Sequence, residues 1–449
     1  MNDRPGLTEI IGDFIARSPS PPAQAIERAR INLVHNLSVA LAAIGRETVA
    51  HRVAVEGRSG PSTLIASGHR STPEWAALAN GALMAIRSQD DTHLASTSHP
   101  GAPVTAAALA VAEVRGASGR EFLEALVFGY EVLGRIGRDF DKEVSDRGFR
   151  AAALWAGFGA AGAAARLHRL DDVAAGHALA LVTHQAGGLL QVWREGSAEF
   201  PYHLGFGARN GVVAAELAAA GATAGRYMLE GEAGLYAAAA GVGRQPLEAL
   251  QGMGDDWQVM EVTVKSFPCC AVLQGPMGLL LTLVEDLDSA SVERCVLSLN
   301  PFEANFPGID NPGPDFASAT ATKMSAQFCL GIGLLEGRLA LGDLHRLTDQ
   351  NVLRLAARIQ VERDEGLQER QCRIVMHLSD GRTLRGAVDK AVGQPDFDEV
   401  RAFALRMAPE IGTGEQEICR MVDEIERLHE APNLDRLIEA VTAAGAESN

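Results

Sequence analysis

Hydrophobic residues recur at helical spacing through more than half of this chain, from Leu7 to about Val264. In AIERARINLVHNLSVALAAIG (residues 25–45) and REFLEALVFGYEVLGRIGRDF (residues 120–140), apolar side chains fall at positions i, i+3, i+4 and i+7. This spacing is typical of amphipathic helices that bury one face. Glycine and proline separate the segments, and no run alternates as a strand would. We therefore predict that this region is all-α.

The pattern changes near Phe267, where a smaller mixed domain begins. RCVLSLNP (residues 294–301) has the composition of a short strand, and CRIVMHLSDGRTLRGAV (residues 372–388) places Asp380-Gly381 between two strand-like runs, which indicates a hairpin. Helical periodicity returns after about Asp398. We predict a mainly α protein with a helical domain at residues 1–266, completed by residues 399–449, and an inserted α+β lid domain at residues 267–398.

The composition is that of a soluble globular protein and excludes some partners. The 449 residues, 47 % hydrophobic and 22 % charged, are too many for one compact core. A net charge of −17 argues against nucleic acid, whose phosphates need a basic surface. Two stretches without charged side chains, residues 173–193 and 266–284, contain polar residues or prolines, so we expect no membrane span.

The N-terminus and the cysteines both favour a cytoplasmic protein. MNDRPGLTEIIGDF lacks the basic and apolar regions of a signal peptide. The six cysteines are scattered, and their spacing matches neither a disulfide framework nor a zinc site.

Two motifs suggest cofactors, but neither has the required context. GFGAAG (residues 157–162) has the spacing of a dinucleotide-binding loop, yet it lies inside a helical run with no strand before it. Close packing of helices explains it better, so we expect no nucleotide cofactor. Asp90, Asp91, His93 and His99 lie close together, but their spacing matches neither a helix-borne zinc site nor a calcium loop, so we expect no metal.

The stretch SQDDTHLASTSHPGAP (residues 88–103) gathers two carboxylates, several hydroxyls and two imidazoles between two apolar helical runs. It is either a solvated loop or an active-site loop. Together with VKSFPCC (residues 264–270), it resembles the MmgE/PrpD family, which includes 2-methylcitrate dehydratase, cis-aconitate decarboxylase and iminodisuccinate epimerase. The resemblance implies a homodimer without a cofactor, an active site between the helical domain and the lid, and chemistry at carbon atoms next to carboxylates.

The match to the family pattern is partial. The chain keeps Asp90, Asp91, Thr92, His99, His203 and Lys265. Ser88 replaces a leading acid, Arg150 replaces a histidine, and Phe200 replaces a lysine. In KSFPCCAVLQ, Ala271 and Gln274 stand where the pattern has an arginine and a histidine. These changes argue against simple dehydration of methylcitrate, which needs a general acid for the departing hydroxyl.

Compared with the family pattern, the chain has more permanently charged arginines and fewer groups that transfer protons. This combination suits a substrate with several carboxylates and no leaving group. Arg150 and Arg87 can bind carboxylates through their guanidinium forks. His99 is a suitable base, and Lys265 could be a second if its surroundings lower its pKa. A helix starting near Pro103 would point its N-terminal amides at the loop and favour an anion. Alternatively, Lys265 only pairs with a substrate carboxylate, or His99 only caps the helix.

We therefore predict a cofactor-independent epimerase, an isomerase that acts on an amino- or imino-polycarboxylate such as iminodisuccinate. Lys265 and His99 are the expected catalytic residues, and the expected substrate-binding residues are Arg87, Asp90, Asp91, Thr92, Arg150 and His203. Thr92 and His203 are equally consistent with structural roles, and Asp90 and Asp91 are expected to orient neighbouring groups rather than to act as bases. Two alternatives remain open. One is a lyase that dehydrates a hydroxy-polycarboxylate, and the other is a non-catalytic anion-binding relative.

Overall fold

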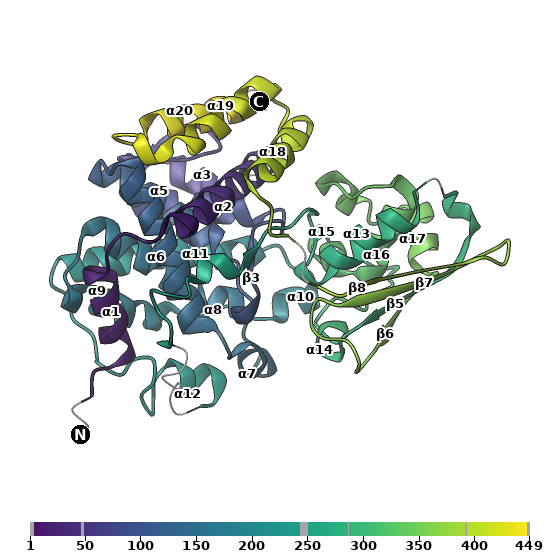
Figure 1. The fold of residues 1–449 in the computed structure, drawn as a ribbon, viewed down its shortest axis with the longest axis horizontal. Coiled ribbons are helices and arrows are strands. Elements are labelled where there is room, and N and C mark those ends of the chain that lie inside the picture. The colour runs from purple at the N-terminus through teal and green to yellow at the C-terminus, as the bar shows by residue number, and fades with distance from the viewer. Residues whose placement is uncertain (1–3, 46–48, 243–249, 286, 391–392, 447–449) are drawn as a thin grey trace.

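The computed structural model describes residues 4–45, 49–242, 250–285, 287–390 and 393–446 and is mainly α, as the periodicity predicts (Figure 1). The helices before the sheet domain are α1 (Leu7–Arg17), α2 (Ala23–Leu41), α3 (Val49–Val55), α4 (Pro73–Ala85), α5 (Gly101–Arg115), α6 (Gly119–Gly137), α7 (Asp141–Asp146), α8 (Ala151–His168), α9 (Asp172–Val182), α10 (Gln191–Glu195), α11 (Phe200–Ala219) and α12 (Leu235–Ala240). No helix in the described ranges is both long and apolar enough to cross a membrane.

Small residues let the central helices approach closely. The GFGAAG motif lies inside α8, whose side chains are almost all buried, so the prediction of helix packing is confirmed. A Cβ on Gly159 would come 2.9 Å from the carbonyl oxygen of Gly129 in α6, and one on Gly207 in α11 would come 2.3 Å from the Ala156 side chain. Larger residues would push these helices apart.

The sheet domain contains one four-stranded sheet with the order β6-β5-β7-β8. Its strands are β5 (Val292–Leu299), β6 (Ile359–Arg363), β7 (Cys372–Leu378) and β8 (Thr383–Val388), and its helices are α13 (Gln274–Leu283), α14 (Pro301–Ala304), α15 (Ala319–Met324), α16 (Ala326–Glu336) and α17 (Gln350–Ala356). Helices α13, α16 and α17 lie over one face of the sheet (Figure 1). The predicted strand and hairpin are confirmed as β5 and β7–β8.

Strand β6 is absent from the sequence prediction. It pairs in parallel with β5 at the edge of the sheet. Ile359 and Val361 alternate with the polar Gln360 and Glu362, a short signal that could have identified the strand.

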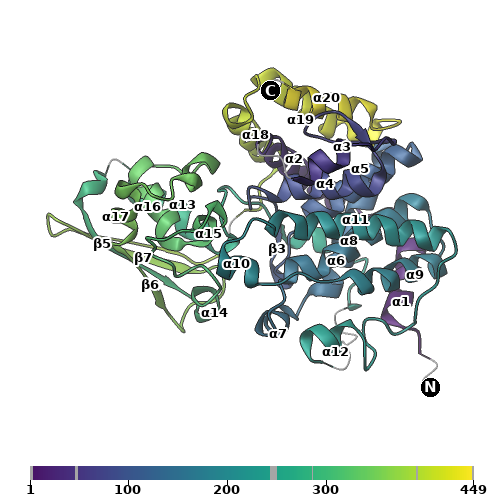
Figure 2. The same ribbon diagram turned by 180° about the vertical axis from the view of Figure 1, so that it is seen from behind.

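The last helices return to the first part of the chain. They are α18 (Phe397–Ile411), α19 (Glu415–Glu426) and α20 (Asp435–Ala446). Figure 2 shows them against α2 and α3, away from the sheet. One hydrophobic cluster joins buried residues between Leu7 and Val262 to others between Val400 and Ala444, and a second cluster centres on the sheet. The second cluster also contains Leu190, Val192, Trp193 and Phe200 from the helical region, so the division at residues 267–398 stays a prediction.

Two small antiparallel pairs interrupt the region that we expected to be all-α. They are β1 (Ser62–Thr63) with β2 (Arg70–Ser71), and β3 (Thr92–His93) with β4 (Val262–Thr263). Two-residue strands are too short to produce a periodic pattern, which explains why the sequence analysis missed them. The second pair joins the loop after α4 to the segment that leads into the sheet domain.

Candidate active site

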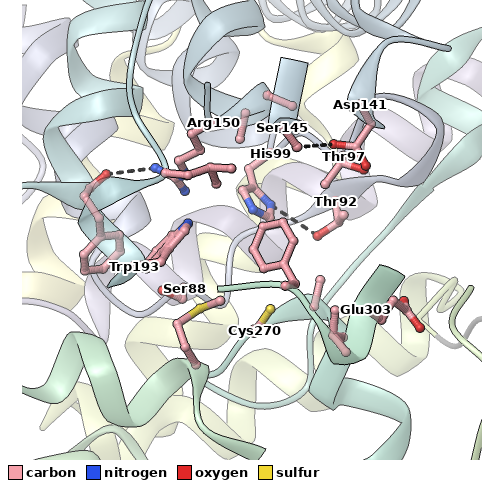
Figure 3. Close-up of a pocket in the computed structure, with 18 of the residues that line it drawn as sticks. Ser88, Thr92, Thr97, His99, Asp141, Ser145, Arg150, Trp193, Cys270 and Glu303 are labelled. Atoms are coloured by element: carbon pink, nitrogen blue, oxygen red, sulfur yellow. Dashed lines mark hydrogen bonds between the residues drawn. The ribbon is translucent and has the colours of Figure 1, made fainter. Parts of the chain in front are cut away.

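A pocket with about 810 Å³ of empty space, part of it open to solvent, lies where the two hydrophobic clusters meet. Its polar lining residues from the helical domain are Ser88, Asp90, Thr92, Thr97, His99, Asp141, Ser145, Arg150 and Lys265, and those from the sheet domain include Cys270, Glu303 and Arg370. Figure 3 shows His99 pointing into the space between Arg150, Thr92 and Cys270.

The loop between α4 and α5 carries strained backbone at two positions that line the cavity. Ser88 has φ 51° and Thr97 has φ 43°, both in the left-handed region. This conformation is unfavourable for residues other than glycine, and most so for a β-branched one such as threonine. Such strain persists only when the surroundings hold it, and it is often found at functional sites. The surrounding structure therefore holds this loop in a fixed, strained conformation in the cavity wall.

Asp91 anchors this loop beneath the cavity. One carboxylate oxygen accepts from the Gly101 N–H at 2.7 Å, and the other accepts from the Tyr130 hydroxyl at 2.5 Å and the Asn36 amide at 3.1 Å. Burial raises the pKa of Asp91 to about 6 in spite of these donors. The helix α5 begins at Gly101, and this first N–H bonds the protein's own carboxylate. The structure therefore does not support the expected substrate anion at this amide.

Lys265 reaches the loop from the residues just after β4. Its Nζ donates to Asp90 Oδ1 at 3.0 Å and to the Ser88 carbonyl oxygen at 3.0 Å. Both partners of the ion pair are nearly fully buried. Burial acts to raise the pKa of Asp90, but Lys265 and His99 outweigh it and the pKa lies below its usual range. Asp90 is thus a buried anion, and its Oδ2 has no hydrogen-bond partner in the described part of the chain.

His99 presents one free nitrogen to the cavity. Its Nδ1 lies 2.9 Å from the Asp91 carbonyl oxygen, which can only accept, so we place the ring hydrogen on Nδ1. Thr92 Oγ1 lies 3.3 Å from the same atom. No described residue bonds Nε2, which therefore keeps its lone pair. Burial, reinforced by Lys265, lowers the pKa of His99 to about 3, so the imidazole is neutral near pH 7 and can accept a proton.

The structure brings His99 and Lys265 together, but not on opposite sides of a substrate. Lys265 Nζ is 3.3 Å from His99 Nδ1. Two atoms in contact leave no room for a carbon between them. The contact places Lys265 where it holds Asp90 and the loop, and it does not place the two side chains for the expected two-base transfer.

Arg150 supplies the positive charge that the departures from the family pattern suggested. It is 6 % exposed, its guanidinium lies over the Trp193 ring at 4.9 Å, and Nη1 donates to the Phe200 carbonyl oxygen at 3.1 Å. Burial lowers the pKa of Arg150 to about 10, so it stays charged. Among the described residues no carboxylate forms an ion pair with it. A buried, uncompensated guanidinium that lines a cavity is suited to binding an anion.

Two other expected binding residues lie outside the lining of this cavity. His203 contacts Arg150 Nη1 at 3.3 Å and lines a neighbouring hollow, so it acts on a substrate only through Arg150. Arg87 donates to Gln89 Oε1 at 2.8 Å and to Glu410 Oε2 at 2.9 Å. It ties the loop to α18, and we leave it out of the proposed substrate-binding set.

Sequence reasoning missed the cavity residues that come from outside the two motifs. Asp141 begins the short helix α7, and Glu303 and Arg370 come from the sheet domain. Burial raises the pKa of both Asp141 and Glu303. Each is an ordinary charged residue in its local sequence, so no motif marks it. Cys270 belongs to the quoted VKSFPCC stretch, which was a signal that could have included it.

The described residues contain no group of three or more His, Cys, Asp or Glu side chains placed to hold a metal ion. Each of the six cysteines lies in the described ranges and is a free thiol.

Comparison with known proteins places these features in a family. The model of the MmgE/PrpD N-terminal domain matches residues 9–246, and that of the C-terminal domain matches residues 267–403. Cis-aconitate decarboxylase of Aspergillus terreus is 24 % identical over 428 residues, which cover 87 % of this chain and 86 % of that protein. The Homo sapiens protein of the same name is 26 % identical over 407 residues, covering 85 % and 82 %. The Mus musculus protein is 24 % identical over 445 residues, covering 92 % and 89 %. Because the two domain models match most of the chain, it belongs to the MmgE/PrpD family.

Proposed function

We propose that this chain is an enzyme that removes a proton from a carbon next to a carboxylate in a small polycarboxylate. The observation that carries the proposal is geometric: the free Nε2 of His99 faces a cavity that Arg150 also lines, and no described carboxylate forms an ion pair with Arg150. Arg150 binds a carboxylate, and Nε2 takes the proton from the neighbouring carbon. The ammonium of Lys265 and the charge of Arg150 stabilise the negative charge that develops.

Asp90 favours a substrate with a hydrogen-bond donor beside its carboxylates. Its Oδ2 is buried and unpartnered, and an ionised carboxylate can only accept. The N–H of an amino- or imino-polycarboxylate satisfies it. Cis-aconitate, the substrate in the names of the similar proteins, contains no N–H or O–H group once ionised. We therefore propose epimerisation of an amino- or imino-polycarboxylate such as iminodisuccinate, in which Nε2 removes the proton from one face of the carbon and a second acid delivers a proton to the opposite face.

Dehydration of a hydroxy-polycarboxylate is the second candidate, and Asp141 is the observation that favours it. A hydroxyl also satisfies Asp90, and a buried carboxyl group whose pKa is raised can protonate a departing hydroxyl. In both reactions His99 acts first, so the two differ only in the step after proton removal.

Proton NMR in deuterated water separates these functions. Iminodisuccinate, 2-methylcitrate and cis-aconitate are each incubated with the protein. Exchange of the α-proton with inversion supports epimerisation, an alkene product supports dehydration, and loss of carbon dioxide from cis-aconitate contradicts the assignment of Asp90. A His99→Asn variant should lose about 10²–10⁴-fold in rate, whereas the control His69→Asn, at an exposed histidine, should not. Binding without reaction in the unaltered protein would support an anion-binding relative and refute the enzyme proposal.

The proposal includes a homodimer, which is expected from the family resemblance. Sedimentation equilibrium measures the mass of the species in solution, which for a homodimer is twice the chain mass of 47.4 kDa. A single species at that mass across micromolar concentrations would refute this part of the proposal.

A further inference from the structure

The sheet domain places a second arginine in the wall of the same cavity. The Arg370 side chain is 13 % exposed, and its Nε and Nη1 are buried without a hydrogen-bond partner in the described residues. Nη1 is 3.1 Å from Glu303 Oε1, but its N–H bonds do not point at that oxygen, so the contact is an ion pair without a hydrogen bond. Buried guanidinium donors are normally paired, so donors left open at a cavity need a ligand.

Glu303 holds the Arg370 backbone in an unfavourable conformation. Arg370 has φ 64°, and its N–H lies 3.1 Å from each Glu303 carboxylate oxygen. The carboxylate is 3 % exposed and comes from α14, which follows β5, the strand that pairs with β7. Left-handed backbone at a residue other than glycine costs free energy, and here the buried carboxylate stabilises it. Glu303 thus fixes the backbone position from which the Arg370 side chain extends. A residue that binds a ligand needs such a fixed position.

The two arginines reach the cavity from different parts of the chain. Figure 3 shows Arg150 on one side of the His99 ring and Glu303, the ion-pair partner of Arg370, on the other. The Cys270 thiol lies within electrostatic range of both guanidinium groups. Arg150 comes from the helical domain and Arg370 from the sheet domain, so a ligand bound by both spans the two domains.

We propose that Arg370 binds a second carboxylate of the substrate, with the reacting carbon between the two bound carboxylates. This inference rests on the proposed function and narrows the substrate class to molecules with carboxylates on both sides of that carbon. A monocarboxylate leaves one guanidinium unpaired. Charged hydrogen bonds of this kind correspond to about a 10- to 100-fold difference in affinity.

Binding of unreactive acids tests the proposal without any turnover. Isothermal titration compares glutarate, which has two carboxylates, with butyrate, which has one. The unaltered protein should bind glutarate about 10-fold or more tightly than butyrate. Arg370→Gln should remove most of this difference by weakening glutarate alone. The control Arg373→Gln changes a half-exposed arginine on β7 that pairs with Asp364, and should bind both acids as before.

Several outcomes overturn the inference. Unchanged glutarate affinity in Arg370→Gln removes the residue from the site, and an equal loss for both acids shows a structural role. Arg370→Lys keeps the charge and should retain part of the preference, which separates binding from folding if Arg370→Gln is unstable. If the unaltered protein prefers glutarate and Arg370→Gln does not, the second subsite stands even where the deuterium experiment shows no reaction, so the two proposals fail independently.

Discussion

Replacing Lys265 with methionine should raise the pKa of His99 by an amount that the structure allows us to approximate. Lys265 Nζ is 3.3 Å from His99 Nδ1. At an effective dielectric constant of about 20, two unit charges at this distance repel by about 5 kcal/mol, or roughly three to four pH units. Burial is the larger cause of the low pKa and remains in the variant. The calculated repulsion is an upper bound, because Lys265 is only the second cause of the low pKa, so we expect a rise of about two to three pH units, from about 3 to between about 5 and 6.

The freed Asp90 adds to this rise, because its anion then favours a protonated imidazole. Leaving that buried carboxylate unpaired also costs about 3–5 kcal/mol of folding free energy. The double variant Lys265→Met, Asp90→Asn is the matched control, because it removes both charges. Its His99 pKa should lie between those of the unaltered protein and the single variant.

The assay is an NMR titration of protein labelled at histidine ¹³Cε1, in which the His99 signal is identified by its absence in His99→Asn. The measurement does not need catalytic activity. A His99 pKa that stays near 3 in Lys265→Met would refute the reasoning, since it would mean that Lys265 does not influence the imidazole. In the unaltered protein, kcat/KM should show no acid limb near pH 6.5.

Buried groups in and around the cavity give three further predictions. Because the folded-state pKa of Asp91 is raised from 3.8 to about 6, folding should lose about 3 kcal/mol of stability as the pH rises through this interval. About 2 kcal/mol of this loss should appear between urea unfolding at pH 4.5 and at pH 7, and Asp91→Asn should lack it. Phe200→Ala should cost about 3–5 kcal/mol, seen as a lower melting temperature, because the ring packs on Trp193 at 5.3 Å, and an unchanged value would contradict this packing. Glutarate should bind more tightly at pH 5 than at pH 8, because a bound anion further favours protonation of Asp141 and Glu303. Calorimetric titration in buffers of different ionisation enthalpy should therefore show that protons are taken up on binding.

The helical domain and the sheet hairpin follow from local pattern alone. The apolar spacing of α6 predicts an amphipathic helix. Asp380 and Gly381 lie in the turn between β7 and β8, where Gly381 has φ 85°. The motif residues Asp90, His99 and Lys265 were also recognisable, because their types and order resemble a family pattern. The contact between Asp90 and Lys265 could not be predicted, because 175 residues separate them in the sequence.

Only the tertiary structure decided what each motif residue does. It placed Lys265 against His99 instead of across a substrate, turned Arg87 toward Glu410, and gave the first N–H of α5 to Asp91. It also brought Glu303 and Arg370 into the cavity. Such roles depend on which atoms face one another after two distant segments pack, and sequence spacing carries no information about that geometry. The residue types are typical of proton transfer and anion binding, and the packing shows which of these side chains face the cavity.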